Sequence, residues 1–218
     1  LLSDMTSMED RDMIANDNKT FKHGMSMMLH RSSDWQVVLG DYNARYYDNP
    51  IQFMHDGDAY MVYPKTGHEW HIGLIPHTTP TWEGVALVHQ DGKIEHLDNE
   101  EAQESEILDG QRLYPLHNTQ VYSESLGMLN GFWNQVPLIG TFDGVVEPAS
   151  LPTHTGNSQP FTVDMKDETM SLVYAMEPTG QSSRGLDEVW FYNAETGERN
   201  YYRSGDTTLL GPERAMDI

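Results

Sequence analysis

The fold is decided by the stretch Val189-Trp-Phe-Tyr-Asn-Ala-Glu-Thr-Gly-Glu-Arg-Asn-Tyr201, in which an aromatic-rich run meets a Thr-Gly pair and continues into a second run. Aromatic and β-branched residues that alternate with polar ones indicate a strand with one buried face. A Thr-Gly pair between two such runs is typical of a tight turn, because glycine readily adopts positive φ. The stretch therefore predicts an antiparallel hairpin over residues 189–202.

Two further stretches resemble this unit. One is Ala59-Tyr-Met-Val-Tyr-Pro-Lys-Thr-Gly-His-Glu-Trp70, and the looser one is Ala86-Leu-Val-His-Gln-Asp-Gly-Lys-Ile-Glu-His96. They predict hairpins over 59–74 and 84–97, so that the chain would repeat one hairpin unit. The alternative is coincidence, since Thr-Gly and Asp-Gly are common turn dipeptides.

Around these hairpins, alternation from Asp34 to Leu74 predicts strands, the first of them over 35–39. Apolar residues at helical spacing predict short helices over 21–29 and 119–132. Asp98 followed three residues later by Glu101 is the signature of a capping box and predicts a helix over 98–108. We therefore expect an α+β fold of antiparallel β-hairpins with a few short helices packed on one side.

The same pattern suggests three parts of the chain. Residues 1–20 are polar and lack a clear period, which is typical of an N-terminal linker or frayed segment. Residues 21–147 form an α+β subdomain with two hairpins. A loop rich in Pro, Thr, Ser and Gly over 148–160 separates it from a β-hairpin subdomain over 161–218, which can pack with the preceding part as one domain.

The charge of the chain restricts the classes of partner. Thirteen Lys and Arg oppose 34 Asp and Glu in 218 residues, for a net charge of −21, which repels phosphate backbones and anionic lipid. We therefore expect no nucleic acid as partner. Only five of the bases are Lys, a pattern typical of proteins adapted to high salt; plain solubility is the alternative.

Cysteine usage and the ends of the chain bear on its origin. With no cysteine, disulfides, thiolate zinc sites and a cysteine nucleophile are excluded, while the compartment stays open. No apolar run reaches the ~20 residues of a membrane helix. The chain starts at Leu1, which leads us to expect a processed chain or a piece of a longer protein, with room for an anchor or a signal peptide outside the given residues.

The C-terminal part of the chain resembles a known family. The stretches Leu172-Val-Tyr-Ala-Met-Glu-Pro178, Leu186-Asp-Glu-Val-Trp-Phe-Tyr-Asn-Ala-Glu-Thr-Gly-Glu-Arg199 and Gly211-Pro-Glu-Arg-Ala215 resemble the PepSY-type domain over residues 161–218, with weaker echoes at 59–74 and 84–108. Asn193 stands where that family usually has Asp. The resemblance implies an extracytoplasmic module of a membrane-anchored or secreted protein, used for binding or for restraining a peptidase, with no catalytic residue to carry over.

The densest group of side chains that could bind a metal consists of histidines. It includes His68 and His71, in the stretch His68-Glu-Trp-His71, and further along the chain His77, His89 and His96. Successive side chains of a strand point to opposite faces, so His68 and His71 would be separated by the sheet. We therefore expect His68, His71 and His77 not to converge, and we predict no metal and no cofactor. The alternative is that cross-strand pairing unites some of them in a metal-dependent hydrolase that uses residues 68–96.

Other catalytic signatures are absent from the sequence. There is no Gly-x-Ser-x-Gly elbow and no phosphate-binding loop, and Asp56-Gly-Asp58 is too short for a calcium loop. Paired carboxylates are common at this composition and carry little information. We therefore predict no catalytic residue and a non-enzymatic protein.

Aromatic side chains on the expected strands are the candidate contacts for a protein partner or for self-assembly. Outward Tyr and Trp anchor many interfaces, and the alternative for each ring is a place in the core. The sequence thus predicts an extracytoplasmic or cell-surface binding or scaffolding module, with a structural subunit of a virion or surface assembly as the alternative. The candidate partner-binding residues are Tyr60, Tyr63, Trp190, Tyr192 and Tyr202.

Overall fold

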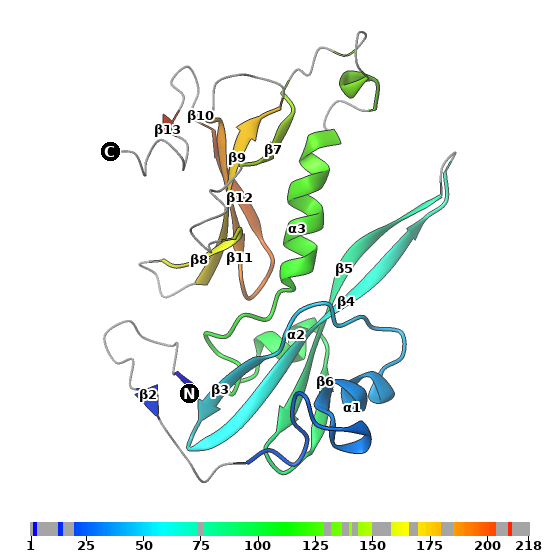
Figure 1. Cartoon of the computed structure of the whole chain (residues 1–218), viewed down its shortest axis with the longest axis vertical. Coiled ribbons are helices and arrows are strands. Elements are labelled where there is room, and N and C mark those ends of the chain that lie inside the picture. Colours follow the sequence, from blue (N-terminus) through cyan, green and yellow to red (C-terminus); the bar gives the residue numbers. More distant parts are fainter. Residues whose placement is uncertain are drawn as a thin grey trace. The chain divides into compact units, whose positions relative to one another are not determined.

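The computed structural model divides the chain into two compact units (Figure 1). Unit 1 consists of Leu1–Asn118, Lys166–Met170 and Ala194–Thr196, and unit 2 consists of Thr119–Met165, Ser171–Asn193 and Gly197–Ile218. The loop 148–160, where the sequence suggested a boundary, lies inside unit 2. The structure describes residues 20–73, 76–128, 133–134, 136, 140, 144–149, 158–165, 170–179 and 185–203, and, for the backbone alone, 2–3, 13–14, 132, 135 and 209–210.

Unit 1 is built on a four-stranded antiparallel sheet with the order β3-β4-β5-β6. Its register pairs Val62 with Leu87 and Ala86 with His96. The last pair of strands confirms the hairpin predicted over 84–97. The strands are β3 (Ile51–His55), β4 (Asp58–His71), β5 (His77–His89) and β6 (Ile94–Leu97).

Both faces of this sheet are buried where all four strands run together. Alternation along β4 sends Val62 to one face and Met61 to the other, and each joins its own cluster of apolar side chains. Helix α2 closes the first cluster with Ala102, and helix α1 closes the second with Val37. The first cluster comprises Phe53, Val62, Val85, Leu87, Ala102, Leu108 and Leu113, and the second Val37, Met61, Tyr63, Ala86 and Val88.

Strands β4 and β5 continue beyond this core as a two-stranded ribbon, which we call the β-arm and define as residues 66–71 and 77–82 (Figure 1). Strand β3 pairs with β4 only as far as Val62, and β6 pairs with β5 only from Val85. Within the β-arm, His68 lies opposite Pro80. The two strands of the β-arm therefore depend mainly on each other for backbone pairing.

A β-bulge marks the start of the β-arm. The register passes from Pro64 opposite Val85 to Thr66 opposite Trp82, so that one residue of β4 faces two of β5. The hairpin predicted over 59–74 is therefore wrong. Thr66 and Gly67 lie within β4, because a backbone bridge from Arg45 to Thr66 and the bulge keep the strand paired past Lys65. The turn Asp56-Gly57 joins β3 to β4, and β4 continues to His71, which lies opposite His77 of β5.

The N-terminal part of the described chain corrects two further predictions. The strand expected over 35–39 is helix α1 (Ser33–Gly40), which the Ser32 side chain caps by accepting a hydrogen bond from the Trp35 N–H. The helix expected over 21–29 is wrong, since residues 20–28 are irregular and only the 3-10 turn η1 (Leu29–Arg31) follows. Three alternating apolar residues fit a short helix as well as a strand, and Ser32-Ser-Asp34 at the N-terminus favours the helix.

Helix α2 (Asn99–Gln103) confirms the capping box at its start. The Asp98 carboxylate accepts from the N–H groups of Glu100 and Glu101, and the Glu101 carboxylate accepts from the Asp98 N–H. This arrangement satisfies backbone donors that the first turn of a helix leaves free. The helix ends earlier than the predicted residue 108.

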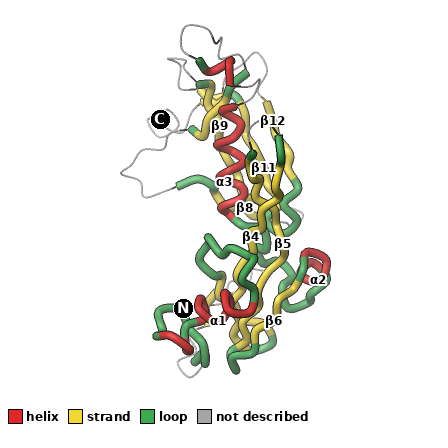
Figure 2. Tube along the Cα trace, turned by 90° about the vertical axis from the view of Figure 1, so that its right-hand side faces the viewer, coloured by secondary structure: helices red, strands yellow, loops and turns green. Residues whose placement is uncertain are grey.

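Unit 2 contains a sheet with the order β12-β11-β9-β7, and β8 pairs with β9. The β11–β12 hairpin confirms the prediction over 189–202, with Gly197 at φ 74°. Helix α3 (Leu116–Ser125) runs along this sheet from Thr119 onward (Figure 2), and its Ser123 hydroxyl is 2.8 Å from that of Tyr192. The strands are β7 (Val146–Pro148), β8 (Phe161–Asp164), β9 (Met170–Pro178), β11 (Glu188–Asn193) and β12 (Arg199–Arg203).

The prediction of an α+β fold with antiparallel sheets and a few short helices is confirmed. The helices do not all pack on one side, because α1 and α2 cover opposite faces of the sheet in unit 1. Helix α3 begins and ends earlier than the predicted 119–132. Among the described residues, no helix is long and apolar enough to cross a membrane. The short elements are β1 (Leu2–Ser3), β2 (Met13–Ile14), η2 (Leu126–Met128), η3 (Phe132–Gln135), β10 (Gly185–Leu186) and β13 (Leu209–Leu210).

Candidate functional site

The outer end of the β-arm exposes large apolar side chains. Trp70 is 72% exposed and Ile72, just beyond the paired residues, is 92% exposed. Covering such side chains with a partner is favourable, because each Å² of apolar surface removed from water contributes roughly 25 cal/mol. An exposed Trp and Ile on a projecting ribbon therefore indicate a contact surface.

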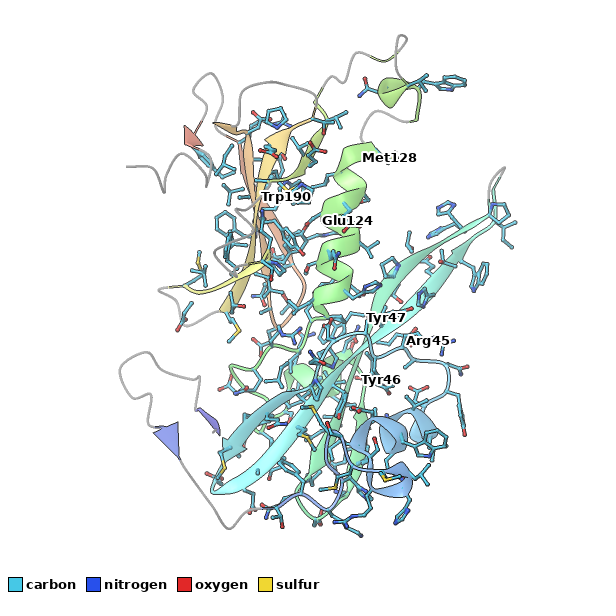
Figure 3. The ribbon with its side chains drawn as sticks, in the orientation of Figure 1. Arg45, Tyr46, Tyr47, Glu124, Met128 and Trp190 are labelled. Carbon is cyan, nitrogen blue, oxygen red and sulfur yellow. The ribbon has the colours of Figure 1, made fainter. Side chains whose placement is uncertain are left out.

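One side of the β-arm borders a cleft of about 480 Å³. The backbone bridge between Arg45 and Thr66, with N–H···O distances of 2.9 and 2.8 Å, aligns the segment 43–47 with β4. Arg45, Tyr46 and Tyr47 are labelled on this segment in Figure 3. The residues that line the cleft are Asn43, Arg45, Tyr47, His68, Trp70, Thr78 and Glu83.

Tyr47 is held in place by two imidazole rings. Its ring centroid is 4.0 Å from that of His117, in a tilted stack, and 6.4 Å from that of His68, edge to face. The Tyr47 side chain nevertheless remains half exposed. These contacts fix the orientation of an aromatic surface that faces the cleft.

The next residue, Asp48, anchors this segment. Its carboxylate accepts hydrogen bonds from the Leu116 N–H at 2.5 Å, the His117 N–H at 3.1 Å and the Arg112 guanidinium at 3.0 Å. Both Asp48 and Arg112 side chains are largely buried, and burial lowers the pKa of Arg112 from its ordinary value. The ion pair is therefore shielded from water and positions the Tyr47 backbone.

Glu83 reaches the cleft across a glycine. A β-carbon at Gly67 would lie 1.8 Å from Glu83 Oε1, so the absence of a side chain at position 67 makes room for this carboxylate. Among the described residues, neither the Glu83 carboxylate nor the Asn43 amide hydrogen-bonds to another side chain. Both polar groups are thus available to a ligand.

The histidines divide between the two faces of the β-arm. His71 and His77 are directly opposed, with ring centroids 5.0 Å apart, and His71 Nε2 is 2.8 Å from Thr79 Oγ1. Cross-strand pairing thus brings His71 and His77 together, which the sequence did not predict, but the described structure does not bring His68, His71 and His77 to one point. His68 lies on the other face and lines the cleft, as its parity predicted.

The remaining metal candidates are placed apart. His89 Nε2 is 3.0 Å from a Glu95 oxygen, and Asp56 and Gly57 form the β3–β4 turn. Within the described part of the chain, no three or more His, Cys, Asp or Glu side chains are grouped so that they could hold a metal ion.

Most of the predicted partner-binding rings contribute to the interior. Tyr63, Trp190 and Tyr192 are buried, and Tyr60 is half-buried and stacks on Phe53 with centroids 5.6 Å apart. Tyr202 is exposed on β12. Strand alternation turns these three buried rings inward, so they belong to the core, which is the alternative that the sequence left open for each ring. A partner contact at Tyr202 stays a prediction.

The buried rings of unit 2 belong to a polar and aromatic network. Trp190, labelled in Figure 3, donates from Nε1 to Glu188 Oε2 at 2.7 Å and stacks on Tyr201, and the Arg203 guanidinium pairs with the other Glu188 oxygen. The Arg199 guanidinium lies 4.0 Å from the Tyr122 ring centroid. Every charged group here is compensated, which is typical of structural packing.

Sequence reasoning missed the cleft residues Arg45, Tyr47, Trp70 and Glu83. The signal that could have found them is the parity of β4, which puts His68 and Trp70 on one face once Thr66 and Gly67 are assigned to the strand. The position of Glu83 depends on the β-bulge, and no sequence motif predicts that bulge.

Comparisons with known proteins do not assign this chain to a family. Neither a family model, nor a curated protein, nor a solved structure matches the chain. The resemblance to PepSY-type domains therefore stays a prediction.

Proposed function

We propose that this protein is a non-enzymatic binding or scaffolding module whose β-arm inserts its apolar end into a recess of a protein partner. The observation that carries the proposal is the exposure of Trp70 and Ile72 on a ribbon that projects beyond its sheet. The connection between the strands, Ile72-Gly-Leu-Ile-Pro76, adds two further apolar residues by sequence. Interface hot spots are enriched in such side chains, Trp above all.

The charge of the chain favours binding to a different protein over association with a second copy of the chain. Glu69 is the only Asp, Glu, Lys or Arg between Thr66 and Trp82, while the whole chain carries −21. The β-arm can therefore enter an apolar recess without burying more than one charge. Two copies of the body would repel each other, whereas a partner with a basic rim would be attracted.

The proposal also places the module outside the cytoplasm or at the cell surface, within a larger membrane-anchored or secreted protein. Its support is the likeness of the C-terminal strands to PepSY-type domains. The absence of cysteine is compatible with export, because no thiol would be exposed to oxidation.

The test is site-specific photo-crosslinking in the source cells, with the photoreactive residue at Ile72. The control position is Met28, which is 81% exposed but lies outside the β-arm. We expect one protein to crosslink from position 72 and not from position 28, and to bind the purified chain but not its Ile72→Ser variant. Equal crosslinking from both positions, or unchanged binding by Ile72→Ser, would refute the role of the β-arm.

A second candidate, a structural subunit of a virion or cell-surface assembly, is favoured by one observation. Strand β12 ends the order of the described sheet in unit 2 and exposes Tyr201 and Tyr202. An edge strand of this kind can pair with another copy. Sedimentation velocity decides: a monomer from low to molar salt supports the binding module, and an oligomer that Tyr202→Lys dissociates supports the assembly subunit.

A further inference from the structure

We infer that the cleft beside the β-arm is a binding site for a neutral saccharide, with a pyranose ring stacked on Trp70 or Tyr47. This site shares Trp70 with the apolar end of the β-arm but does not include Ile72, and the inference goes beyond the protein partner proposed above. It stands on three properties of the lining residues: exposed aromatic surface, balanced charge, and free hydrogen-bonding groups of both kinds.

The aromatic surface comes from two elements. Trp70 belongs to β4, and Tyr47 to the segment that the Arg45–Thr66 bridge aligns with β4. One face of a pyranose ring is made of C–H groups, which carry partial positive charge and favour the negative face of an aromatic ring. Tyr47 is already fixed by His68 and His117, so binding would cost little side-chain entropy there.

The charges of the cleft argue against an ionic ligand. Arg45 and Glu83 both line it, one cation and one anion. A phosphate or sulfate group would meet Glu83 within a chain of net charge −21. A quaternary ammonium would find aromatic rings, but also the Arg45 guanidinium. A neutral polar ligand avoids both penalties.

The hydrogen-bonding groups favour hydroxyls. The Glu83 carboxylate only accepts, the Asn43 amide accepts and donates, and the Thr78 hydroxyl does both. Sugar hydroxyls are donors and acceptors in the same way. A proline-rich peptide, the other common ligand of exposed Trp and Tyr, offers carbonyl acceptors and few N–H donors, and so would leave Glu83 without a partner. The cleft volume of about 480 Å³ lies within the range of small-molecule sites.

Gly67 belongs to the same site through Glu83. Because a β-carbon at position 67 would collide with Glu83 Oε1 and Cδ, the Gly67→Ala variant has to turn this carboxylate away. Loss of binding in Gly67→Ala would therefore report on the position of the carboxylate, while Glu83→Gln reports on its charge.

The experiment is ligand-observed NMR and titration calorimetry on the full chain. The probes are neutral oligosaccharides of glucose, mannose, galactose and N-acetylglucosamine, at up to about 10 mM, where millimolar dissociation constants are measurable. We expect at least one probe to bind, and Trp70→Ala, Glu83→Gln and Gly67→Ala each to weaken it at least about tenfold, a loss typical of removing one good contact.

Two matched controls keep the outcomes distinct. Trp35→Ala removes an exposed Trp outside the cleft, and Ile72→Ser alters the end of the β-arm; both should bind the saccharide like the unmodified chain. Circular dichroism verifies that every variant is folded. The inference is overturned if no probe binds, if binding survives Trp70→Ala, or if a proline-rich peptide binds in a Trp70-dependent way instead. Neither the success nor the failure of crosslinking at Ile72 affects this result.

Discussion

Gly84 lies directly against the carbonyl oxygen of Leu97: a β-carbon at position 84 would be 2.1 Å from that atom. Gly84 also adopts φ 87°, a conformation that other residues reach only with strain. The contact lies at the bulge between the core of the sheet and the β-arm. A single glycine therefore sets where β6 can approach β5 and where the β-arm starts.

Two glycine substitutions should consequently differ in their effects. Gly84→Ala is expected to lower the free energy of unfolding by about 2–4 kcal/mol. The strain of positive φ and the clash of the new β-carbon with the Leu97 carbonyl both contribute to this loss. Gly67→Ala should change it by less than about 1 kcal/mol, because only the flexible Glu83 side chain has to move. Urea unfolding measures both, and equal destabilisation would contradict the described position of the bulge.

The Asp48–Arg112 pair should be important for stability. Asp48→Ala removes the acceptor for Arg112 and for two backbone N–H groups, and we expect a loss of about 3–5 kcal/mol, since a charge stays buried without its partner. The double variant Asp48→Ala/Arg112→Met should recover part of this loss. If the double variant is as unstable as the sum of the single ones, the two side chains are not coupled.

Alkaline pH should destabilise the fold through buried tyrosines. Burial raises the pKa of Tyr63 and of Tyr192 above the ordinary value of 10.0. Above pH 10 the unfolded chain therefore loses these protons first, and the free energy of unfolding falls by about 1.4 kcal/mol per pH unit for each tyrosine. Tyr63→Phe and Tyr192→Phe should each make the slope shallower in urea unfolding between about pH 9 and 11.5; an unaltered slope would speak against protected hydroxyls.

Salt should stabilise a chain with net charge −21. Raising sodium chloride from about 0.1 to 1 M shortens the screening length from about 10 to 3 Å and weakens repulsion among the carboxylates. If the acidity reflects a high-salt habitat, the melting temperature should climb markedly over this range. Potassium chloride at equal ionic strength is the control. A flat dependence would favour plain solubility as the reason for the acidic surface.

The histidines of the β-arm should be dispensable for folding. His71→Ala and His77→Ala remove an exposed ring pair and are expected to change the free energy of unfolding by less than about 0.5 kcal/mol. Metal analysis of the dialysed protein should find no stoichiometric zinc or copper. Metal that survives dialysis and is lost in His71→Ala would instead support the metal-dependent hydrolase.

The sequence predicted strands well where apolar residues alternate over a long run and a turn follows. The hairpins at 84–97 and 189–202 have a turn glycine at positive φ, Gly92 and Gly197. At 59–74 the Thr-Gly pair has the same local chemistry, but Arg45 and β5 supply backbone partners from elsewhere in the chain. Local propensity could not reveal those partners.

The candidate site was predicted less well, for a geometric reason. The sequence predicts Tyr60, Tyr63 and Trp190 as partner contacts because they are aromatic and lie on expected strands, but the face on which each ring lies depends on register. Trp70 and Tyr47 come from segments that only the Arg45–Thr66 bridge brings together. The position of Glu83 depends on a bulge. Each of these relations is nonlocal, and pairing between strands decides it.

The proline opposite His68 has a consequence for how concentrated solutions of this protein behave. A two-stranded ribbon with open edges is a template for fibre growth, because further strands can add to its free backbone groups. Pro80 has no N–H to offer and so interrupts the row of donors along β5. The β-arm can therefore display Trp70 and Ile72 to water while resisting strand-by-strand aggregation, and Pro80→Thr is the substitution that would remove this protection.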